Sequence, residues 1–307
     1  MKILHGLYNL IFNHHNYAAN LSALTILPVA GGRIEYCSFG SGPPLILVMG
    51  YAATLNSWDS RFLTELAKSY QVIVYNNRNL GNSLFAAAEY SISDMANDVE
   101  LLRVGLKLDK IALAGLSMGG VIAQKYAYLF PDKLSQLILI NTLPPGILMH
   151  KPPLAVENVL RDLESGSWLN SWRLTKLLLP SIWQLPGLWL NHFKPRASNK
   201  EVPSTTIAEQ QRVLEGWSNW QHPETLLKII TTPTLILLGL ADRLVPPQNS
   251  RVLKHYLKNS ELVEYKDGGH IMIFEYPFAL AQTIHQFIQS TDQPAANKVA
   301  SEQPVAC

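Results

Sequence analysis

The chain has 307 residues, of which 48% are hydrophobic and 16% are charged, and its formal net charge is +2. An average soluble protein is about 25% charged, so this composition allows a large buried core. The sequence holds no basic block typical of nucleic-acid binding and no run of about 18 apolar residues that would span a membrane. Its two cysteines, Cys37 and Cys307, cannot form a disulfide framework or a Cys-x-x-Cys metal site.

Residues 1–30 form a first segment, and its amphipathic start predicts an N-terminal helix. One helical face collects Ile3, Leu4, Leu7, Leu10 and Ile11. We expect the helix to pack on the body of a cytoplasmic protein. The alternatives are weak association with a membrane surface and a signal peptide of an exported protein. A signal peptide fits less well, because a single lysine precedes the apolar run and polar residues interrupt it.

Short apolar runs alternate with amphipathic segments over most of the remaining chain. An antiparallel hairpin is expected around residues 33–42. Runs typical of buried strands follow at residues 45–49, 71–75, 111–115, 137–140, 234–239 and 261–265. Helical periodicity is found at residues 57–70, 92–108, 118–130 and 247–258. The alternation predicts an α/β fold with a mostly parallel, doubly wound sheet, which has helices on both faces.

Residues 144–222 break this alternation, because they contain no strand pattern and several prolines. We therefore predict a helical cap inserted into an α/β core that comprises residues 31–143 and 223–292. The polar residues 293–307 are expected to form a disordered tail. Six of the seven tryptophans lie in the insertion: Trp168, Trp172, Trp183, Trp189, Trp217 and Trp220. They line an apolar pocket or attach the cap to the core, and the two roles can hold together.

The stretch IALAGLSMGGVIAQ places a serine between glycines where a strand pattern changes to a helix pattern. Gly115, Ser117 and Gly119 form a Gly-x-Ser-x-Gly motif, in which a sharp turn exposes the serine and the glycines avoid clashes. The N–H groups at the start of the next helix face such a turn and stabilise negative charge there. Ser117 is therefore a candidate nucleophile, and the alternative is a tight turn with a spare serine.

A serine hydroxyl needs a base, and His270 is the candidate among nine histidines. It follows the last strand pattern and two glycines, where a parallel sheet gathers its reactive loops. Asp242 directly follows the strand pattern at residues 234–239 and is the candidate acid that orients the histidine. An ordinary loop histidine and a helix-capping aspartate are the alternatives. Asp267 shares the loop of His270 and is geometrically poorer, and Asn141 carries no charge and cannot serve as the acid.

The chain order Ser117, Asp242, His270, with each residue after a strand, resembles the α/β-hydrolase superfamily. The resemblance covers about residues 31–291 and is greatest to the lid-bearing esterases and lactonases of that superfamily. It implies that the backbone N–H groups of Tyr51 and Met118 form an oxyanion hole.

Two further stretches are similar to family motifs but depart from them. YNNRNLGNS, residues 75–83, is similar to an Asp-x-Arg-Gly-x-Gly-x-Ser loop, with Asn76 and Asn79 in place of Asp and Gly. Asparagine tolerates a left-handed backbone, so Asn79 is a workable replacement. LILVMGYAATLNSW, residues 45–58, is similar to the strand and loop that carry a His-Gly pair, with Met49 in place of the histidine.

The sequence thus predicts a serine hydrolase that cleaves a carboxylic ester, lactone or related acyl substrate of apolar character through an acyl-enzyme. No metal or organic cofactor is expected, and the partner is a small-molecule substrate rather than a nucleic acid. The same scaffold also suits perhydrolysis (the cofactor-free haloperoxidase activity), C–C bond hydrolysis and acyl transfer. The remaining alternatives are a non-catalytic binder of hydrophobic ligands and a membrane-associated interaction protein that uses the N-terminal helix.

Overall fold

The computed structural model describes residues 24–156, 177–180 and 202–292. The greater part of the predicted N-terminal helix, the predicted tail and much of the predicted cap therefore lie outside the described residues.

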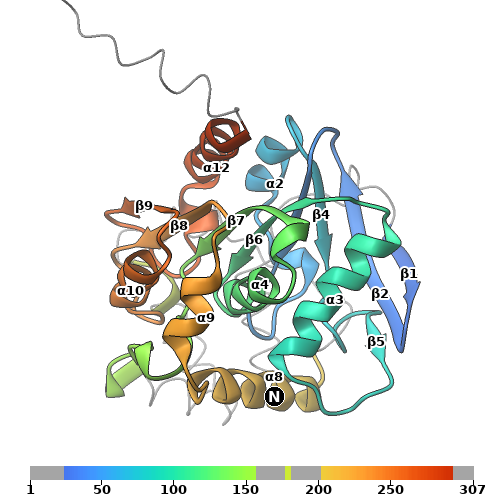
Figure 1. Cartoon of the computed structure of the whole chain (residues 1–307), viewed down its shortest axis with the longest axis horizontal. Helices are drawn as coiled ribbons and strands as arrows, with labels where there is room; N and C mark the ends of the chain where they lie inside the picture. The colour runs from blue at the N-terminus through green and yellow to red at the C-terminus, as the bar shows by residue number, and fades with distance from the viewer. Residues whose placement is uncertain (1–23, 157–176, 181–201, 293–307) are drawn as a thin grey trace, which may run out of the picture.

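A nine-stranded sheet runs through the centre of the described part of the chain (Figure 1). Its order is β1-β2-β4-β3-β6-β7-β8-β9, with β5 beside β2. The pairs from β4 across to β9 are all parallel, whereas β1, β2 and β5 join the edge through antiparallel pairs. The strands are β1 (Thr25–Val29), β2 (Gly32–Phe39), β3 (Pro44–Val48), β4 (Gln71–Tyr75), β5 (Leu84–Phe85), β6 (Ile111–Leu116), β7 (Leu134–Ile140), β8 (Thr234–Gly239) and β9 (Ser260–Tyr265). The predicted, mostly parallel sheet is confirmed.

Helices follow the strands and cover both faces of the sheet. The α-helices are α2 (Ser60–Ala67), α3 (Ile92–Gly105), α4 (Met118–Leu129), α8 (Ser204–Ser218), α9 (Pro223–Ile229), α10 (Gln248–Tyr256), α11 (Met272–Glu275) and α12 (Pro277–Asp292). Short 3₁₀ turns lie at η1 (Leu55–Ser57), η2 (Pro131–Lys133) and η3 (Gly146–Leu148). Side chains mark two of the helix starts: Asp59 accepts the first N–H groups of α2, and Ser91 forms a capping box with Asp94 at α3.

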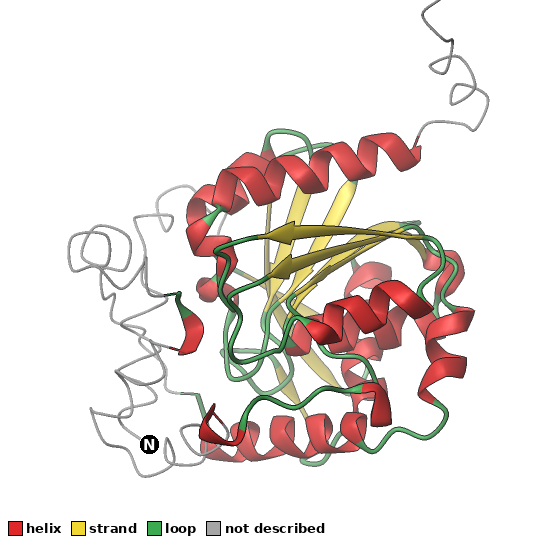
Figure 2. Cartoon of the chain, turned by 90° about the vertical axis from the view of Figure 1, so that its left-hand side faces the viewer, coloured by secondary structure: helices red, strands yellow, loops and turns green. Residues whose placement is uncertain are grey.

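Alternate residues of the central strands enter two apolar clusters, one on each face of the sheet. Figure 2 shows the helices that lie on the two sides of the sheet. In β3, Leu45 and Leu47 pack in the cluster that includes side chains of α2, α11 and α12. Ile46 and Val48 pack in the cluster that includes side chains of α3, α4, α9 and α10. Because both sets are buried, the strands appear in the sequence as continuous apolar runs.

The hairpin at the sheet edge lies earlier in the chain than predicted. β1 pairs with β2 from Thr25 opposite Tyr36 to Val29 opposite Gly32, so residues 33–42 supply only the second strand. Residues 25–29, which we expected to close an N-terminal helical segment, are thus a strand. The β-branched residues of TILPV suit this edge position, where one side of the ribbon pairs with β2.

The helix α8 falls within residues 144–222, the predicted cap, and lies across the bottom of the molecule in Figure 1. Its buried side is formed by Thr206, Gln210, Val213 and Trp217, which are spaced at three to four residues. The indole N–H of Trp217 donates to the carbonyl of Leu143 (3.3 Å), and its ring lies 5.9 Å from that of Trp220. Trp217 thus binds residue 143, where the predicted core segment ends, and the other four tryptophans of residues 144–222 lie outside the described residues.

Candidate functional site

Ser117 occupies the sharp turn between β6 and α4. Its backbone has φ 56° and ψ −121°, a conformation that L-residues rarely adopt and that stores strain. The N–H of Ser117 donates to the carbonyl of Ile140 (2.9 Å), and its carbonyl accepts from the hydroxyl of Thr142 (2.6 Å). Ser117 is half-buried while its neighbours on both sides are buried. The turn therefore presents this side chain at the surface of the core.

The two glycines of the motif lie where no side chain fits. A Cβ atom on Gly115 would collide with the carbonyl oxygen of Gly119, and one on Gly119 would collide with the carbonyl oxygen of Val48 at the end of β3. Gly50, in the loop after β3, also approaches closely, because its Cβ would lie 3.2 Å from the Cβ of Ser117. The glycine pattern in the sequence thus reflects the close approach of β3, β6 and α4.

His270 and Asp242 form a buried pair in the loops after β9 and β8. The Nδ1 atom of His270 lies 2.8 Å from Oδ2 of Asp242, and the two residues are 5% and 4% exposed. The other oxygen, Oδ1, accepts the N–H groups of Leu244 and Val245, each at 2.8 Å. Asp242 therefore binds the turn that follows it rather than capping α10. Asp267, the other aspartate considered for this role, is exposed.

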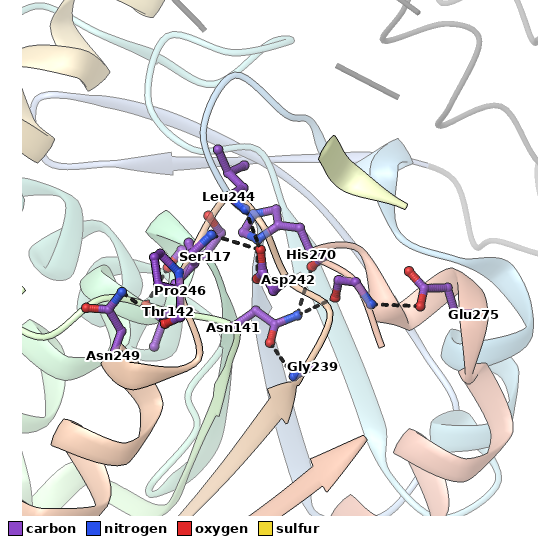
Figure 3. Close-up of polar contacts among 12 residues, drawn as sticks. Ser117, Asn141, Thr142, Gly239, Asp242, Leu244, Pro246, Asn249, His270 and Glu275 are labelled. Atoms are coloured by element: carbon purple, nitrogen blue, oxygen red, sulfur yellow. Dashed lines mark hydrogen bonds and ion pairs between the residues drawn. The ribbon is translucent and has the colours of Figure 1, made fainter. Parts of the chain in front are cut away.

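The end of β7 connects Ser117 to His270. Thr142 donates to the carbonyl of Ser117, and the adjacent Asn141 donates through Nδ2 to the carbonyl of His270 (3.0 Å). Figure 3 shows Ser117, Asp242 and His270 grouped at this point. Within the described residues no hydrogen bond joins the Ser117 hydroxyl to the His270 ring. Such bonds often form fully only when substrate is bound.

The loop after β3 lies against Ser117. Gly50 lies against Ser117, and Tyr51, which follows it, is 38% exposed. Met118 is the first residue of α4, where the N–H groups have no acceptor within the helix. The next residue of the loop, Ala52, has φ 53°, and its N–H donates to Oε1 of Gln210 on α8 (2.8 Å). The helix α8 thus binds the loop directly beyond Tyr51.

The backbone of the histidine loop is bound on several sides. Asn141 Nδ2 donates to the carbonyls of Gly269 (2.8 Å) and His270, and the Gly269 N–H donates to Glu275 Oε2 (2.8 Å). The His270 N–H donates to the carbonyl of Leu178, in the described segment 177–180 (3.0 Å). All four polar backbone atoms of these two residues therefore have partners.

Glu275 is a buried carboxyl group next to this loop. Burial raises its pKa to about 8, the N–H of Gly269 counteracts part of that rise, and the negative charge of Asp242 adds to it. Its second oxygen, Oε1, is buried and has no hydrogen-bond partner among the described residues. The raised pKa of Glu275 favours the neutral, protonated carboxyl over the carboxylate.

The described ranges contain no group of three or more His, Cys, Asp or Glu side chains arranged to hold a metal ion. No helix in the described part of the chain is both long and apolar enough to cross a bilayer.

Comparison with known protein families identifies the family of the chain. A family described as "alpha/beta hydrolase fold" matches residues 43–277, which include the loops of all three candidate residues. The chain belongs to the α/β-hydrolase family. The resemblance based on the order of serine, aspartate and histidine is thereby confirmed.

Relatives of this α/β-hydrolase have several names. A protein of Pseudomonas syringae named "Putative carbamate hydrolase RutD" is 27% identical, over 83% of this chain and 96% of its own length. A protein of Synechocystis sp. named "Putative non-heme chloroperoxidase" is 24% identical, over 83% of this chain and 95% of its own. A solved thermophilic esterase from Thermogutta terrifontis shares the fold with a TM-score of 0.72 and 24% identity, over 89% of this chain and 100% of its own.

The departures of this α/β-hydrolase from the family motifs have local explanations. Asn79 has φ 60°, so asparagine occupies the left-handed position that we predicted for it. Asn76 donates to the carboxylate of Glu35 (2.6 Å) and accepts the N–H of Leu55 (2.8 Å). A carboxylate at position 76 would face that of Glu35, which explains the neutral amide. Met49 is held through its backbone carbonyl, which accepts from the side chain of Asn77 (3.0 Å).

Sequence reasoning missed three residues that bind the loops of the site. Asn141 directly follows a buried strand of the parallel sheet, a position that favours functional residues, but we considered it only as an acid. Gln210 has the helical spacing of the buried side of α8. A polar residue at such a position could have indicated a buried hydrogen bond. Glu275 lies in an apolar stretch, and no pattern in the sequence distinguishes it from a surface glutamate.

Proposed function

We propose that this α/β-hydrolase is a serine hydrolase that cleaves a carboxylic ester, lactone or related acyl substrate of apolar character. Ser117 is the nucleophile, His270 the general base and acid, and Asp242 the group that orients the histidine. The N–H groups of Tyr51 and Met118 stabilise the negative oxygen of the tetrahedral intermediate.

The buried contact between His270 and Asp242 carries this proposal. With Nδ1 held by the carboxylate at 2.8 Å, Nε2 is the ring nitrogen that remains to accept a proton from serine. The carboxylate also stabilises the positive charge that the ring then acquires. Ser117, on a strained turn that exposes its side chain, is the nucleophile that this pair serves.

The reaction proceeds in two halves. Ser117 Oγ attacks the substrate carbonyl as its proton passes to His270, and the N–H groups of Tyr51 and Met118 bind the oxyanion. One such donor lowers the barrier by roughly 3 to 4 kcal/mol. His270 then gives the proton to the leaving alcohol, and the acyl group stays on Ser117. Water, deprotonated by His270, releases the acid and restores the serine.

The apolar character of the substrate is supported by the cap segment beside the histidine. Leu178, Leu179 and Pro180 are buried there, and Pro180 lies so close to Gly269 that a Cβ on the glycine would be 2.5 Å from its Cδ. An apolar acyl or alcohol group fits such a surface better than a charged one.

Covalent labelling with a fluorophosphonate tests the nucleophile and the base together. We expect the label on Ser117 by mass mapping, no label in Ser117→Ala, and strongly slowed labelling in His270→Ala. His285→Ala is the matched control, because its ring also has a hydrogen-bonded Nδ1 (3.0 Å from the hydroxyl of Tyr70) but lies on α12. A label on another residue, or an undiminished rate in His270→Ala, would reject the proposal.

The names of two relatives define the alternatives to test beside esters. Carbamate hydrolysis would use the same attack on a carbonyl carbon, and a chloroperoxidase name corresponds to perhydrolysis, in which hydrogen peroxide replaces water in the second half. Turnover on a panel of esters, lactones, carbamates, 1,3-diketones and peracid-forming acids separates these reactions from C–C bond hydrolysis. Absence of turnover on the whole panel, with no fluorophosphonate label, would favour a non-catalytic binder.

A further inference from the structure

Asn141, directly after β7, bonds to both loops that supply the His270–Asp242 pair of the site. Its Oδ1 accepts the N–H of Gly239, at the end of the strand that leads to Asp242 (2.9 Å). Its Nδ2 donates to the carbonyls of Gly269 (2.8 Å) and His270 (3.0 Å). Figure 3 shows these contacts around one side chain.

The orientation of the Asn141 amide is determined by its partners. The carbonyl oxygens of Gly269 and His270 need a donor, and the N–H of Gly239 needs an acceptor. Rotating the amide by about 180° would exchange its nitrogen and oxygen and break all three bonds. The residue is 1% exposed, so the loss of one of these bonds is costly. Its backbone has φ 43°, a left-handed conformation that asparagine tolerates.

We propose that Asn141 is a positioning residue for the reaction, one that sets the separation of the Asp242 loop from the His270 loop. The inference rests on the proposed roles of these two residues in a serine hydrolase. Asn141 does not touch the reacting atoms. It acts through the backbone, by binding the two loops to one rigid strand end.

The neighbouring residue extends this arrangement to the nucleophile. Thr142 binds the carbonyl of Ser117 (2.6 Å), and the N–H of Ser117 binds the carbonyl of Ile140. Three consecutive residues at the end of β7 therefore hold the backbone of Ser117 on one side and that of the His270 loop on the other. An error of about 1 Å in such a geometry can slow a reaction roughly 100-fold.

Asn141→Asp is the sharpest test, because it preserves size and the acceptor for Gly239 but places an oxygen against two carbonyls. Asn141→Gly removes the side chain and suits the positive φ, so it keeps the test informative if the aspartate variant does not fold. Asn249→Asp is the matched control. Asn249 is fully buried, accepts the N–H of His150 and donates to the carbonyls of His150 and Pro246, which is the same pattern of bonds at another place.

The variants are compared by circular dichroism, by kcat and KM on an activated ester, and by the downfield proton resonance of the His270–Asp242 bond. We expect both Asn141 variants to lose about 100-fold in kcat with KM changed less than about threefold, and the proton resonance to shift or disappear. Asn249→Asp should lower the melting temperature while its kcat and the resonance stay close to those of the wild type.

A purely structural role would give the opposite result. If the folded Asn141 variants keep the wild-type kcat and resonance, or lose no more kcat than Asn249→Asp does, the positioning role is rejected. That failure is distinct from failure of the proposed function, which would appear in the wild-type protein as absent turnover and absent labelling of Ser117.

Discussion

At the scale of single residues, the two oxygens of Asp242 have separate partners. Oδ2 lies 2.8 Å from His270 Nδ1, while Oδ1 binds the N–H groups of Leu244 and Val245. In Asp242→Asn, Oδ1 can keep the turn, but an NH₂ group then faces Nδ1 and favours the wrong ring tautomer. We expect a loss of roughly 10³- to 10⁴-fold in kcat on an activated ester with the fold retained. Asp267→Asn is the control, and full activity in Asp242→Asn would mean that another acid orients the histidine.

The paired glutamines Gln210 and Gln211 allow a second test at the residue scale. Gln210 is fully buried and accepts the N–H of Ala52, beside the proposed oxyanion donor Tyr51, whereas Gln211 is exposed on the same helix. In Gln210→Leu the Ala52 N–H loses its acceptor and the loop shifts, so kcat should fall about 10- to 100-fold. Gln211→Leu should stay near the wild-type rate, and equal rates in the two variants would show that the cap helix does not position the loop.

At the scale of elements, the turn between β6 and α4 depends on glycines, because a side chain at Gly115 or Gly119 would collide with backbone atoms. Gly119→Ala would press a methyl group into the end of β3, and we expect it to lower the free energy of unfolding by about 1 to 3 kcal/mol. Gly216→Ala, on α8, meets no atom within 4 Å and should instead stabilise the helix by roughly 0.5 to 1 kcal/mol. Urea unfolding at equilibrium measures both, and a Gly119→Ala variant as stable as the wild type would contradict the close packing.

At the scale of the whole molecule, the sheet could be predicted from the sequence because its strands are buried on both faces. Apolar runs such as residues 71–75 and 234–239 therefore indicate buried strands. The candidate residues lie in loops that follow strands of this sheet. The edge hairpin was misplaced because β1 is short and partly exposed, so its apolar pattern is weak. The hydrogen bonds of Asn141 to Gly239, Gly269 and His270 could not be predicted from the sequence. They depend on backbone atoms that only the folded chain brings together.

The raised pKa of Glu275 predicts that the stability of the whole molecule depends on pH. Burial raises the pKa of its carboxyl from 4.5 to about 8, with Asp242 adding to the rise. Between these values the folded protein holds a proton that the unfolded chain has released, so the free energy of unfolding falls as the pH rises. The fall is a few kcal/mol, because one pKa unit corresponds to about 1.4 kcal/mol.

Glu275→Gln isolates this contribution, because glutamine stays neutral and its oxygen can still accept the N–H of Gly269. Other groups facing this region, among them Asp242, His270 and the Arg61–Asp59 pair on α2, are the same in both proteins. Urea unfolding at pH 5 and at pH 8.5 should therefore show a smaller loss of stability in the variant than in the wild type. Parallel pH dependences would mean that Glu275 is already ionised in the folded protein at neutral pH, with its charge balanced by contacts other than the Gly269 N–H.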